Sequence, residues 1–335
     1  MAMGRTLRNL AANVLTLLIL ALVVLSATVY WGQQTFVAPG PLEETTVVTV
    51  PRGGNLNDVT EDLVEVGAIG NETVFRIGAR YAEVNRRLKF GEYEIPAAAS
   101  MSDIVELLTS GRAIQYFVTV PEGLTSWEVV ELLKEEEILT GEIAEVPAEG
   151  SLAPNTYGVN RNDSRASVIA RMQDAQERIL DAAWAGRIEE LPLSTREEAL
   201  ILASIIEKET GVPEERRQVA SVFVNRLERG MRLQTDPTVI YGITLGQGPL
   251  GRGLRRSELD RRTAYNTYQI DGLPPTPIAN PGRASIEAAL DPAETPFVFF
   301  VADGTGGHAF AETLQEHNRN VAKWREIERS RLQSQ

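Results

Sequence analysis

An uncharged apolar run near the N-terminus restricts the fold of this chain more than any other stretch. Residues 10–29 read LAANVLTLLILALVVLSATV and contain no charged residue, proline or glycine. A helix needs about 20 such residues to cross the hydrocarbon core of a bilayer. Tyr30 and Trp31 follow the run, where interfacial aromatic residues usually lie. The sequence therefore predicts a transmembrane anchor at residues 10–31.

The same run could be a signal peptide that is removed after export. The apolar core of a signal peptide is usually about 7–15 residues long and ends at a small-residue cleavage site. This run is longer and no A-x-A pattern closes it, so a retained anchor is favoured. Arg5 and Arg8 mark residues 1–9 as a cytoplasmic tail, because positively charged flanks stay inside. We expect a single-pass protein of the cell membrane, with residues 32–335 outside the cytoplasm.

Composition excludes several classes of function. The formal net charge is -13 and the chain has only four lysines. A protein that follows nucleic-acid phosphates needs a basic face, so nucleic acid is not an expected partner. The absence of cysteine excludes disulfides, thiolate metal sites and cysteine nucleophiles. With only two histidines, a histidine-rich metal site is not expected either.

Beyond the anchor, the sequence predicts the α+β class and begins with a small module. Residues 32–44 combine glycine, proline and acidic residues without periodicity, as is typical of a linker. Residues 45–112 predict a strand, two helices, a second strand and a further helix, with Asn55 and Ser102 as helix N-caps. The module resembles the LysM carbohydrate-binding module, most nearly in VTVPRGGNLNDV. A small spacer without a ligand is the alternative.

Residues 113–330 predict a larger α+β domain. Strand composition occurs at residues 114–120 and 295–303, and helical periodicity at residues 166–184. Residues 141–165 are expected to be rich in loops.

One predicted helix carries two glutamates directly after an apolar run, in LILASIIEKETG. Ser194 and Glu197 form a capping-box pattern, so the helix is expected to begin at about residue 195. Gly211 and Pro213 are expected to end it. Apolar residues cover most of its circumference, which predicts a buried helix.

Helical spacing distinguishes the two glutamates. Glu209 shares a face with three large aliphatic side chains, those of Leu202, Ile205 and Ile206. Glu207 lies on a smaller, more polar strip that includes Ser204. Desolvation raises the pKa of a carboxyl group and keeps its proton near neutral pH, as a general acid requires. Glu209 is therefore the candidate acid, and Glu207 and Ser204 are expected to support it.

A structural explanation competes with this one. Glu209 could simply pair with an arginine of the next predicted helix, which contains Arg216, Arg217 and Arg226. Ion-pair networks also place carboxylates beside apolar faces, so spacing alone leaves both explanations open.

Further polar residues follow this helix pair. Asn225 lies near a helix end and could reach a cleft or cap the helix. Asp236 precedes a proline and fits a helix N-cap, whereas Gln234 would suit a sugar hydroxyl. Residues 263–282 are rich in proline, glycine, asparagine and tyrosine, which predicts a shaped loop that forms a binding wall or a structured connection. His308 is expected in a turn. Its side chain either stabilises that turn or lines a cleft.

Together these segments resemble the endolytic lytic transglycosylase family (MltG, YceG-like) of the bacterial cytoplasmic membrane. The match is close over about residues 195–325 and looser over the anchor and the small module. The strings that carry it are ASIIEKET (203–210), ERRQVASVFVNRL (215–227), MRLQTDPTVIYG (231–242), AYNTYQIDGLPPTPIANPG (264–282) and FFVADGTGGHAF (299–310). The sequence departs from the family at APNTY (153–157), where members often carry a phenylalanine and an aspartate.

The resemblance implies an enzyme of cell wall assembly. It would cleave the MurNAc–GlcNAc β-1,4 bond within peptidoglycan strands and leave 1,6-anhydro-N-acetylmuramic acid ends, with no metal or cofactor. The family's catalytic glutamate is the second in E-K-E-T, which is Glu209 here. Peptidoglycan synthases (penicillin-binding proteins) are expected partners. Residues of the matching strings that are expected near the substrate are Gln234, Asn225, Asp236, Tyr265, Asn266, Tyr268 and His308.

The implied chemistry needs only one catalytic carboxylate. Ordinary glycosidases use two, one as the acid and one to activate water or form a glycosyl-enzyme. A lytic transglycosylase instead uses the C6 hydroxyl of the sugar as the nucleophile. Two other functions stay open. One is a water-using muramidase with Asp236 or Glu207 as the second carboxylate, and the other is a non-catalytic wall-binding scaffold for synthesis enzymes.

Overall fold

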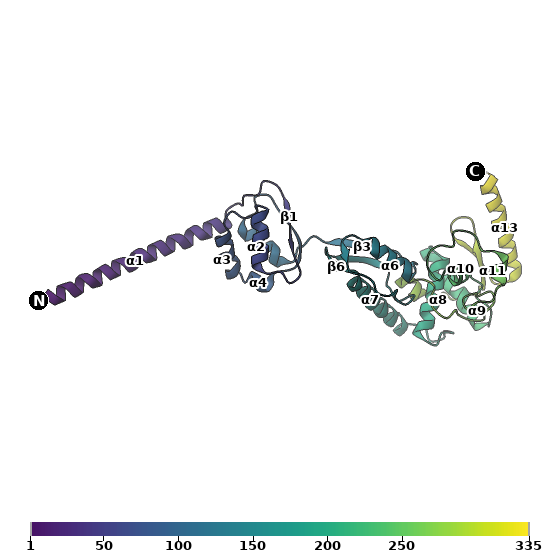
Figure 1. The fold of residues 1–335 in the computed structure, drawn as a ribbon. Coiled ribbons are helices and arrows are strands. Elements are labelled where there is room, and N and C mark those ends of the chain that lie inside the picture. Colours follow the sequence, from purple (N-terminus) through teal and green to yellow (C-terminus); the bar gives the residue numbers. More distant parts are fainter. Residues whose placement is uncertain (1, 334–335) are drawn as a thin grey trace. The chain divides into compact units, whose positions relative to one another are not determined.

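The computed structural model describes residues 2–333 (Figure 1). The chain divides into two compact units, Met1–Tyr116 and Phe117–Gln335. Each unit has its own hydrophobic core.

The first unit begins with the long helix α1 (Ala2–Val37). Its segment Ala12–Val37 has a mean hydropathy of 2.4 and is long and apolar enough to cross a membrane. The helix continues past residue 31, so the predicted linker wrongly includes residues 32–37. The physical reason is that the first helix-breaking proline is Pro39. The Phe36 ring also packs against the core of this unit.

The rest of the first unit is a two-stranded antiparallel sheet with helices. Strand β1 (Thr46–Val50) pairs with β2 (Gly91–Ile95) in a register that runs from Thr46↔Ile95 to Val50↔Gly91. Between the strands lie α2 (Leu56–Glu65), α3 (Glu72–Tyr81) and the one-turn helix α4 (Val84–Arg87), and α5 (Met101–Ser110) follows. The predicted order of strand, two helices and strand is present, with α4 as an addition. Phe75 and Tyr93 are fully buried in its core.

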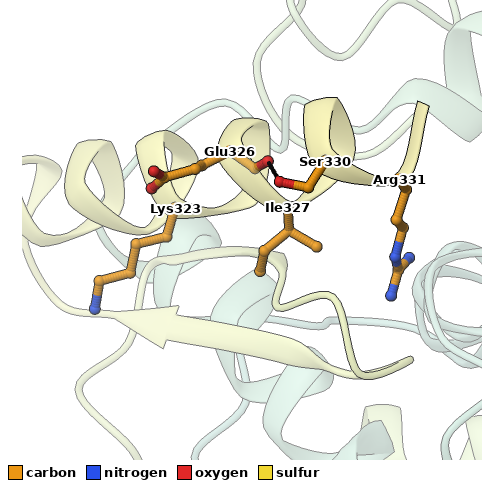
Figure 2. A pocket seen from close by; sticks show the side chains of 5 residues that line it. All are labelled: Lys323, Glu326, Ile327, Ser330 and Arg331. Carbon is orange, nitrogen blue, oxygen red and sulfur yellow. Dashed lines mark hydrogen bonds between the residues drawn. The ribbon is translucent and has the colours of Figure 1, made fainter. Parts of the chain in front are cut away.

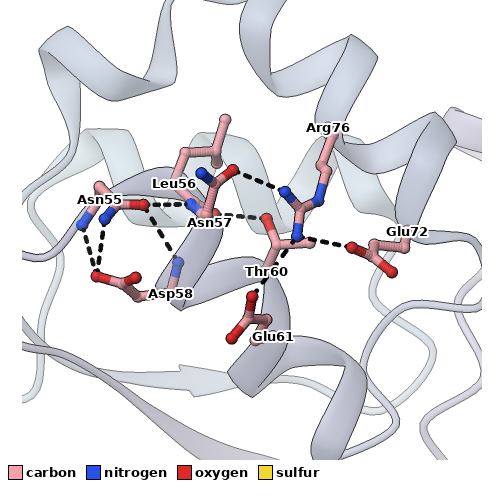
Figure 3. Close-up of polar contacts among 8 residues, drawn as sticks. All are labelled: Asn55, Leu56, Asn57, Asp58, Thr60, Glu61, Glu72 and Arg76. Atoms are coloured by element: carbon pink, nitrogen blue, oxygen red, sulfur yellow. Dashed lines mark hydrogen bonds and ion pairs between the residues drawn. The ribbon is translucent and has the colours of Figure 1, made fainter.

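Helix caps in this unit follow local side-chain chemistry. Asn55 caps α2 as predicted, because its side chain accepts from the backbone N–H groups of Asn57 and Asp58 (Figure 3). The prediction for α5 was wrong by two residues: the cap is Ser100, and Ser102 lies inside the helix. Ser100 has Asp103 three residues later, which completes a reciprocal capping box.

The second unit opens with short strands around two helices. These elements are β3 (Tyr116–Val120), α6 (Ser126–Glu135), β4 (Leu139–Thr140), β5 (Asn155–Val159), β6 (Asp163–Ser164) and α7 (Arg165–Ala185). β5 pairs with β3, and β4 pairs with β6 in parallel. The predicted loop at residues 141–165 therefore contains two strands. Both are short, and their partners lie earlier in the chain, so local periodicity does not reveal them.

A helical core forms the rest of this unit. It contains α8 (Arg196–Glu209), the 3-10 turn η1 (Pro213–Glu215), α9 (Arg216–Glu228), α10 (Asp236–Thr244), α11 (Arg256–Asp260) and α12 (Arg283–Leu290). A hairpin of β7 (Phe299–Ala302) and β8 (His308–Ala311) precedes α13 (Leu314–Gln333). Helices α8, α9 and α12 pack on one another, and Leu202, Ile205 and Phe223 are buried between them.

Two predicted caps in this region are displaced by one residue. Thr195, not Ser194, caps α8, because its side chain accepts from the N–H of Glu198. Glu198 rather than Glu197 reaches back, to the N–H of Ser194. Thr235, not Asp236, occupies the N-cap position of α10, which places Asp236 in the first helical turn.

Candidate active site

Glu209 is the last residue of α8, where the helix leaves the core. The three aliphatic residues on its predicted face, Leu202, Ile205 and Ile206, are all fully buried. Thr210 then turns to an extended conformation and ends the helix. Glu209 itself is partly exposed, so the residue stands at the edge of the apolar core.

A hydroxyl group from another segment meets this carboxylate. The buried Thr235 donates a hydrogen bond from Oγ1 to Oε1 of Glu209. Thr235 is in turn fixed by Thr238 and Thr267, whose hydroxyls lie 2.8 Å apart and both bond its carbonyl oxygen. We call Thr235, Thr238 and Thr267 the threonine cluster. All three are buried, so the cluster fixes one side of Glu209 without adding a charge.

Burial dominates the electrostatics of Glu209. It raises the pKa of this carboxyl above the usual range of a glutamate, and the charge of Asp236 raises the pKa further. The hydrogen bond from Thr235 and the charges of His308 and Arg226 act in the opposite direction. The net effect is a raised pKa, which keeps the proton on Glu209 at higher pH than an ordinary glutamate would.

The competing explanation, an ion pair with an arginine, does not match the contacts. Arg226 is buried, and its guanidinium donates to the carbonyl oxygens of Val298 at 2.7 Å, Leu233 at 2.7 Å and Arg232 at 3.2 Å. Arg217 pairs with Asp291 instead. Within residues 2–333, Glu209 takes part in no ion pair.

Several predicted site residues gather around Glu209. The Tyr268 hydroxyl donates to Oδ1 of Asp236 at 2.7 Å, and burial followed by this bond raises the pKa of Tyr268. Asp236 and Tyr268 both interact electrostatically with Glu209. Gln234 is exposed on the same loop and has a left-handed backbone at φ 50°. Its side-chain oxygen lies 3.5 Å from Nη1 of Arg226.

His308 reaches the same region from the β7–β8 hairpin. Glu215 accepts from its backbone N–H at 2.9 Å and contacts its Nδ1 at 2.8 Å. Its ring also meets the edge of Phe300, with centroids 5.2 Å apart. The charge of His308 lowers the pKa of Glu209, and the contacts with Glu215 fix the position of His308.

Other predicted site residues have their polar atoms engaged in holding the framework. The fully buried Asn266 donates its amide to the carbonyl oxygens of Glu258, Leu259 and Arg261. Asn225 donates to the carbonyls of Thr295 and Phe297. These two side chains hold loops beside the site rather than pointing at Glu209.

Tyr265, Ser204 and Glu207 also hold neighbouring segments. The Tyr265 hydroxyl lies 2.8 Å from that of Thr276, within the predicted shaped loop. Ser204 is buried and accepts from the N–H of Ile278 at 3.0 Å. Glu207 accepts from the N–H of Gly282 at 2.9 Å, at the start of α12.

Sequence reasoning did not identify Thr235 or Asn280. Thr235 stands directly before Asp236 in LQTDPT, and that position was its only signal. Asn280 is buried, accepts from the N–H of Leu152 at 2.9 Å and donates to the carbonyl of Leu124 at 3.0 Å. It thereby ties the loop of residues 263–282 to the start of the second unit.

Two hollows differ in their relation to Glu209. One, of about 370 Å³, is lined by residues that include Lys208, Pro237 and Tyr241, so it adjoins both α8 and the loop of Thr235. The other, of about 550 Å³, lies along α13 and is lined by Lys323, Glu326, Ile327, Ser330 and Arg331 (Figure 2). In the described part of the chain, no group of three histidine, aspartate or glutamate side chains is arranged to hold a metal ion.

Known proteins are similar to this chain over most of its length. Residues 48–323 match the YceG-like family. The endolytic murein transglycosylase of Bacillus subtilis (strain 168) is 29% identical over 313 residues, which cover 84% of this chain and 85% of that protein. The endolytic murein transglycosylase of Streptococcus pneumoniae serotype 2 (strain D39) is 28% identical over 90% of this chain and 63% of its own length.

A solved structure is also similar. The crystal structure of a YceG-like protein from Listeria monocytogenes has 29% sequence identity and a TM-score of 0.52, and the match covers 83% of this chain and 99% of that one.

Proposed function

This chain belongs to the YceG-like family, and from that premise we propose that it is a membrane-anchored endolytic transglycosylase of peptidoglycan. It cleaves the β-1,4 bond between N-acetylmuramic acid and N-acetylglucosamine inside glycan strands. The observation that carries the proposal is the partly exposed Glu209, with a pKa raised by burial and a hydroxyl donor on its carboxylate. The names of its relatives support the substrate class.

Glu209 performs both proton transfers of the reaction. In its protonated form it gives its proton to the glycosidic oxygen, and the bond from that oxygen to C1 of the muramic acid breaks. The C6 oxygen of the same sugar then bonds to C1, and the Glu209 carboxylate takes the proton from the C6 hydroxyl. The products are a free hydroxyl on one fragment and a 1,6-anhydro ring on the other, and Glu209 is protonated again.

The surroundings of Glu209 suit both halves of this cycle. Burial favours the protonated acid at the start, and the Thr235 hydroxyl stabilises the carboxylate that exists between the two transfers. Gln234, Asp236, Tyr268 and His308 are proposed to contact the sugar rings. Gln234 and Asp236 are exposed, which leaves their polar groups accessible to substrate hydroxyls.

The apolar helix α1 is proposed to anchor the protein with its N-terminus in the cytoplasm, so that both units face the peptidoglycan. Residues 45–112 are proposed as a LysM-like glycan-binding module and residues 113–330 as the catalytic domain. Penicillin-binding proteins, which supply new glycan strands, are the proposed partners.

Product masses test the proposal. Residues 32–335 are incubated with purified peptidoglycan, and the soluble fragments are analysed by mass spectrometry. Internal fragments that end in anhydro sugars, each lighter by one water than a reducing end, are expected. Fragments with reducing ends would instead assign a hydrolytic muramidase, with Asp236 as the second carboxylate. Binding of glycan without any release of fragments would assign a scaffold.

A further inference from the structure

The junction between α1 and α3 fixes how the first unit stands on its anchor. A Cβ atom at Gly78 would collide with the ring of Phe36, so the two helices are in close contact there. The N-cap of α3, Asn71, lines a hollow together with residues on both sides of Phe36, namely Thr35 and Ala38. The first two turns of α3 therefore lie beside the C-terminal end of α1.

Gly78 meets α1 at Phe36, in the last turn of the apolar segment Ala12–Val37. Tyr81 lies about one helical turn further along α3, roughly 4–5 Å along the helix. The headgroup layer on each side of a bilayer is about 5–8 Å thick. With α1 across the bilayer, the end of α3 therefore lies near the height of the lipid headgroups.

Two large apolar side chains are exposed at this height. Tyr81 is 93% exposed and Ile77, one turn earlier, is 66% exposed. Residues four positions apart share a helix face, and this face adjoins the strip of Gly78 that touches α1. Tyrosine is enriched at membrane interfaces, where its ring is apolar and its hydroxyl stays hydrated.

Basic residues lie close to Ile77 and Tyr81 in the sequence. The basic residues that follow on α3, α4 and the next turn are all exposed: Arg80, Arg86, Arg87 and Lys89. Glu83 is the acidic residue within this stretch, and it lies 3.8 Å from Arg86. Arg76 is engaged by Asn57 and Glu72 (Figure 3). A basic stretch in a chain with a net charge of -13 favours an anionic surface.

We propose that the end of α3 and helix α4 form a docking surface for the anionic lipid headgroups of the membrane that α1 crosses. Ile77 and Tyr81 enter the interfacial layer, and Arg80, Arg86 and Arg87 meet the lipid phosphates. The proposal rests on the anchoring of α1 but not on the chemistry of Glu209. Its consequence is that the first unit lies against the bilayer instead of standing free above it.

Fluorescence quenching in nanodiscs tests this surface. Because the chain has no cysteine, single-cysteine variants of the full chain can be labelled at one site with an environment-sensitive fluorophore. The test variant is Ile77→Cys. The reference variants are Leu20→Cys, inside the apolar helix, and Glu65→Cys, at the exposed C-terminal residue of α2. Nanodiscs of phosphatidylcholine with phosphatidylglycerol carry a headgroup-attached or chain-attached nitroxide quencher.

We expect headgroup quenching at position 77 at least three-fold stronger than at position 65, and chain quenching at position 20. In phosphatidylcholine alone, or with Arg80, Arg86 and Arg87 changed to glutamate, the quenching at position 77 should fall at least two-fold. Quenching at position 77 no stronger than at position 65 would overturn the docking surface while leaving the anchor intact. Quenching at position 77 that does not depend on lipid charge would overturn the role of the arginines. No quenching at position 20 would remove the anchor and the proposal with it.

Discussion

Thr235 donates a hydrogen bond to the carboxylate of Glu209 across 26 residues of sequence. Two influences act on the same proton in opposite directions. The burial of Glu209 favours the neutral acid, and the Thr235 hydroxyl favours the anion. A group that first donates and then accepts a proton benefits from both influences. This pair is therefore the centre of the predictions on catalysis.

Replacing Glu209 by glutamine should abolish strand cleavage. General acid–base catalysis contributes about 10²–10⁴-fold to rate, and glutamine can neither give nor take the proton. We expect a loss in this range, measured as anhydro products released from peptidoglycan, with an unchanged circular dichroism spectrum. Full activity in this variant would exclude Glu209 as the acid.

Glu207 provides the matched control on the same helix. Its carboxylate accepts from the N–H of Gly282 at the start of α12, so Glu207→Ala leaves that donor without its partner. We expect a loss of about 1–2 kcal/mol in the free energy of unfolding, measured with urea, and less than a ten-fold loss of activity. A stable but inactive Glu207→Ala protein would exchange the roles of the two glutamates.

The pH dependence of activity should depend on Thr235. Glu209 acts in its protonated form, so activity should fall as the pH rises through the raised pKa of this group. The Thr235 hydrogen bond lowers that pKa, and Thr235→Val removes it without a large change in shape. The alkaline limb of kcat should therefore move to higher pH in Thr235→Val. A limb that moves to lower pH would contradict the assignment of Glu209 as the acid.

The free energy of unfolding should also depend on pH through the ionisation of Glu209. A carboxyl whose folded-state pKa is raised binds its proton more tightly when folded, so ionisation at higher pH costs stability. Glu209→Gln avoids this cost. The variant should gain stability relative to the wild type as the pH rises from the ordinary pKa of a glutamate to the raised one. Urea unfolding at pH 4 and pH 8 measures the difference, and a gain that is larger at pH 4 would refute it.

Asn280 should prove more important for stability than its position in a loop suggests. Asn280→Ala leaves the buried N–H of Leu152 without its acceptor and removes the side-chain bond to the carbonyl of Leu124, which keeps the bond from the backbone N–H of residue 280. We expect a loss of about 2–3 kcal/mol in urea unfolding. Asn318→Ala on the exposed face of α13 is the control and should lose little. Equal stability of the two variants would remove the structural role of Asn280.

Local rules predicted the parts of the site that depend on one helix. The spacing in α8 places Glu209 on the face of Leu202, Ile205 and Ile206, and their full burial confirms that prediction. The displaced N-caps show that such rules locate the start of a helix to within one or two residues. Ser100 and Ser102 differ by two positions, and only Ser100 has an acidic residue placed to return its hydrogen bond.

Residues whose partners lie far away in sequence could not be assigned this way. Asn266 and Tyr265 lie in a string that suggests sugar binding, yet the Asn266 amide bonds to the end of α11 and the Tyr265 hydroxyl bonds to Thr276 in its own loop. The hydrogen bond from Thr235 to Glu209 and that from Gly282 to Glu207 depend on how α8, α10 and α12 pack. No periodicity within a single segment encodes such a contact.

The threonine cluster has a consequence for the proposed placement of the enzyme outside the cytoplasm, where acidity varies with the surroundings. Alcohol groups keep the same protonation in weak acid and in weak base, so the scaffold behind Glu209 does not alter when the medium does. The charged neighbours of Glu209, Asp236 and His308 among them, act on its pKa from outside this cluster. The buried support of the catalyst therefore stays constant when the external medium changes.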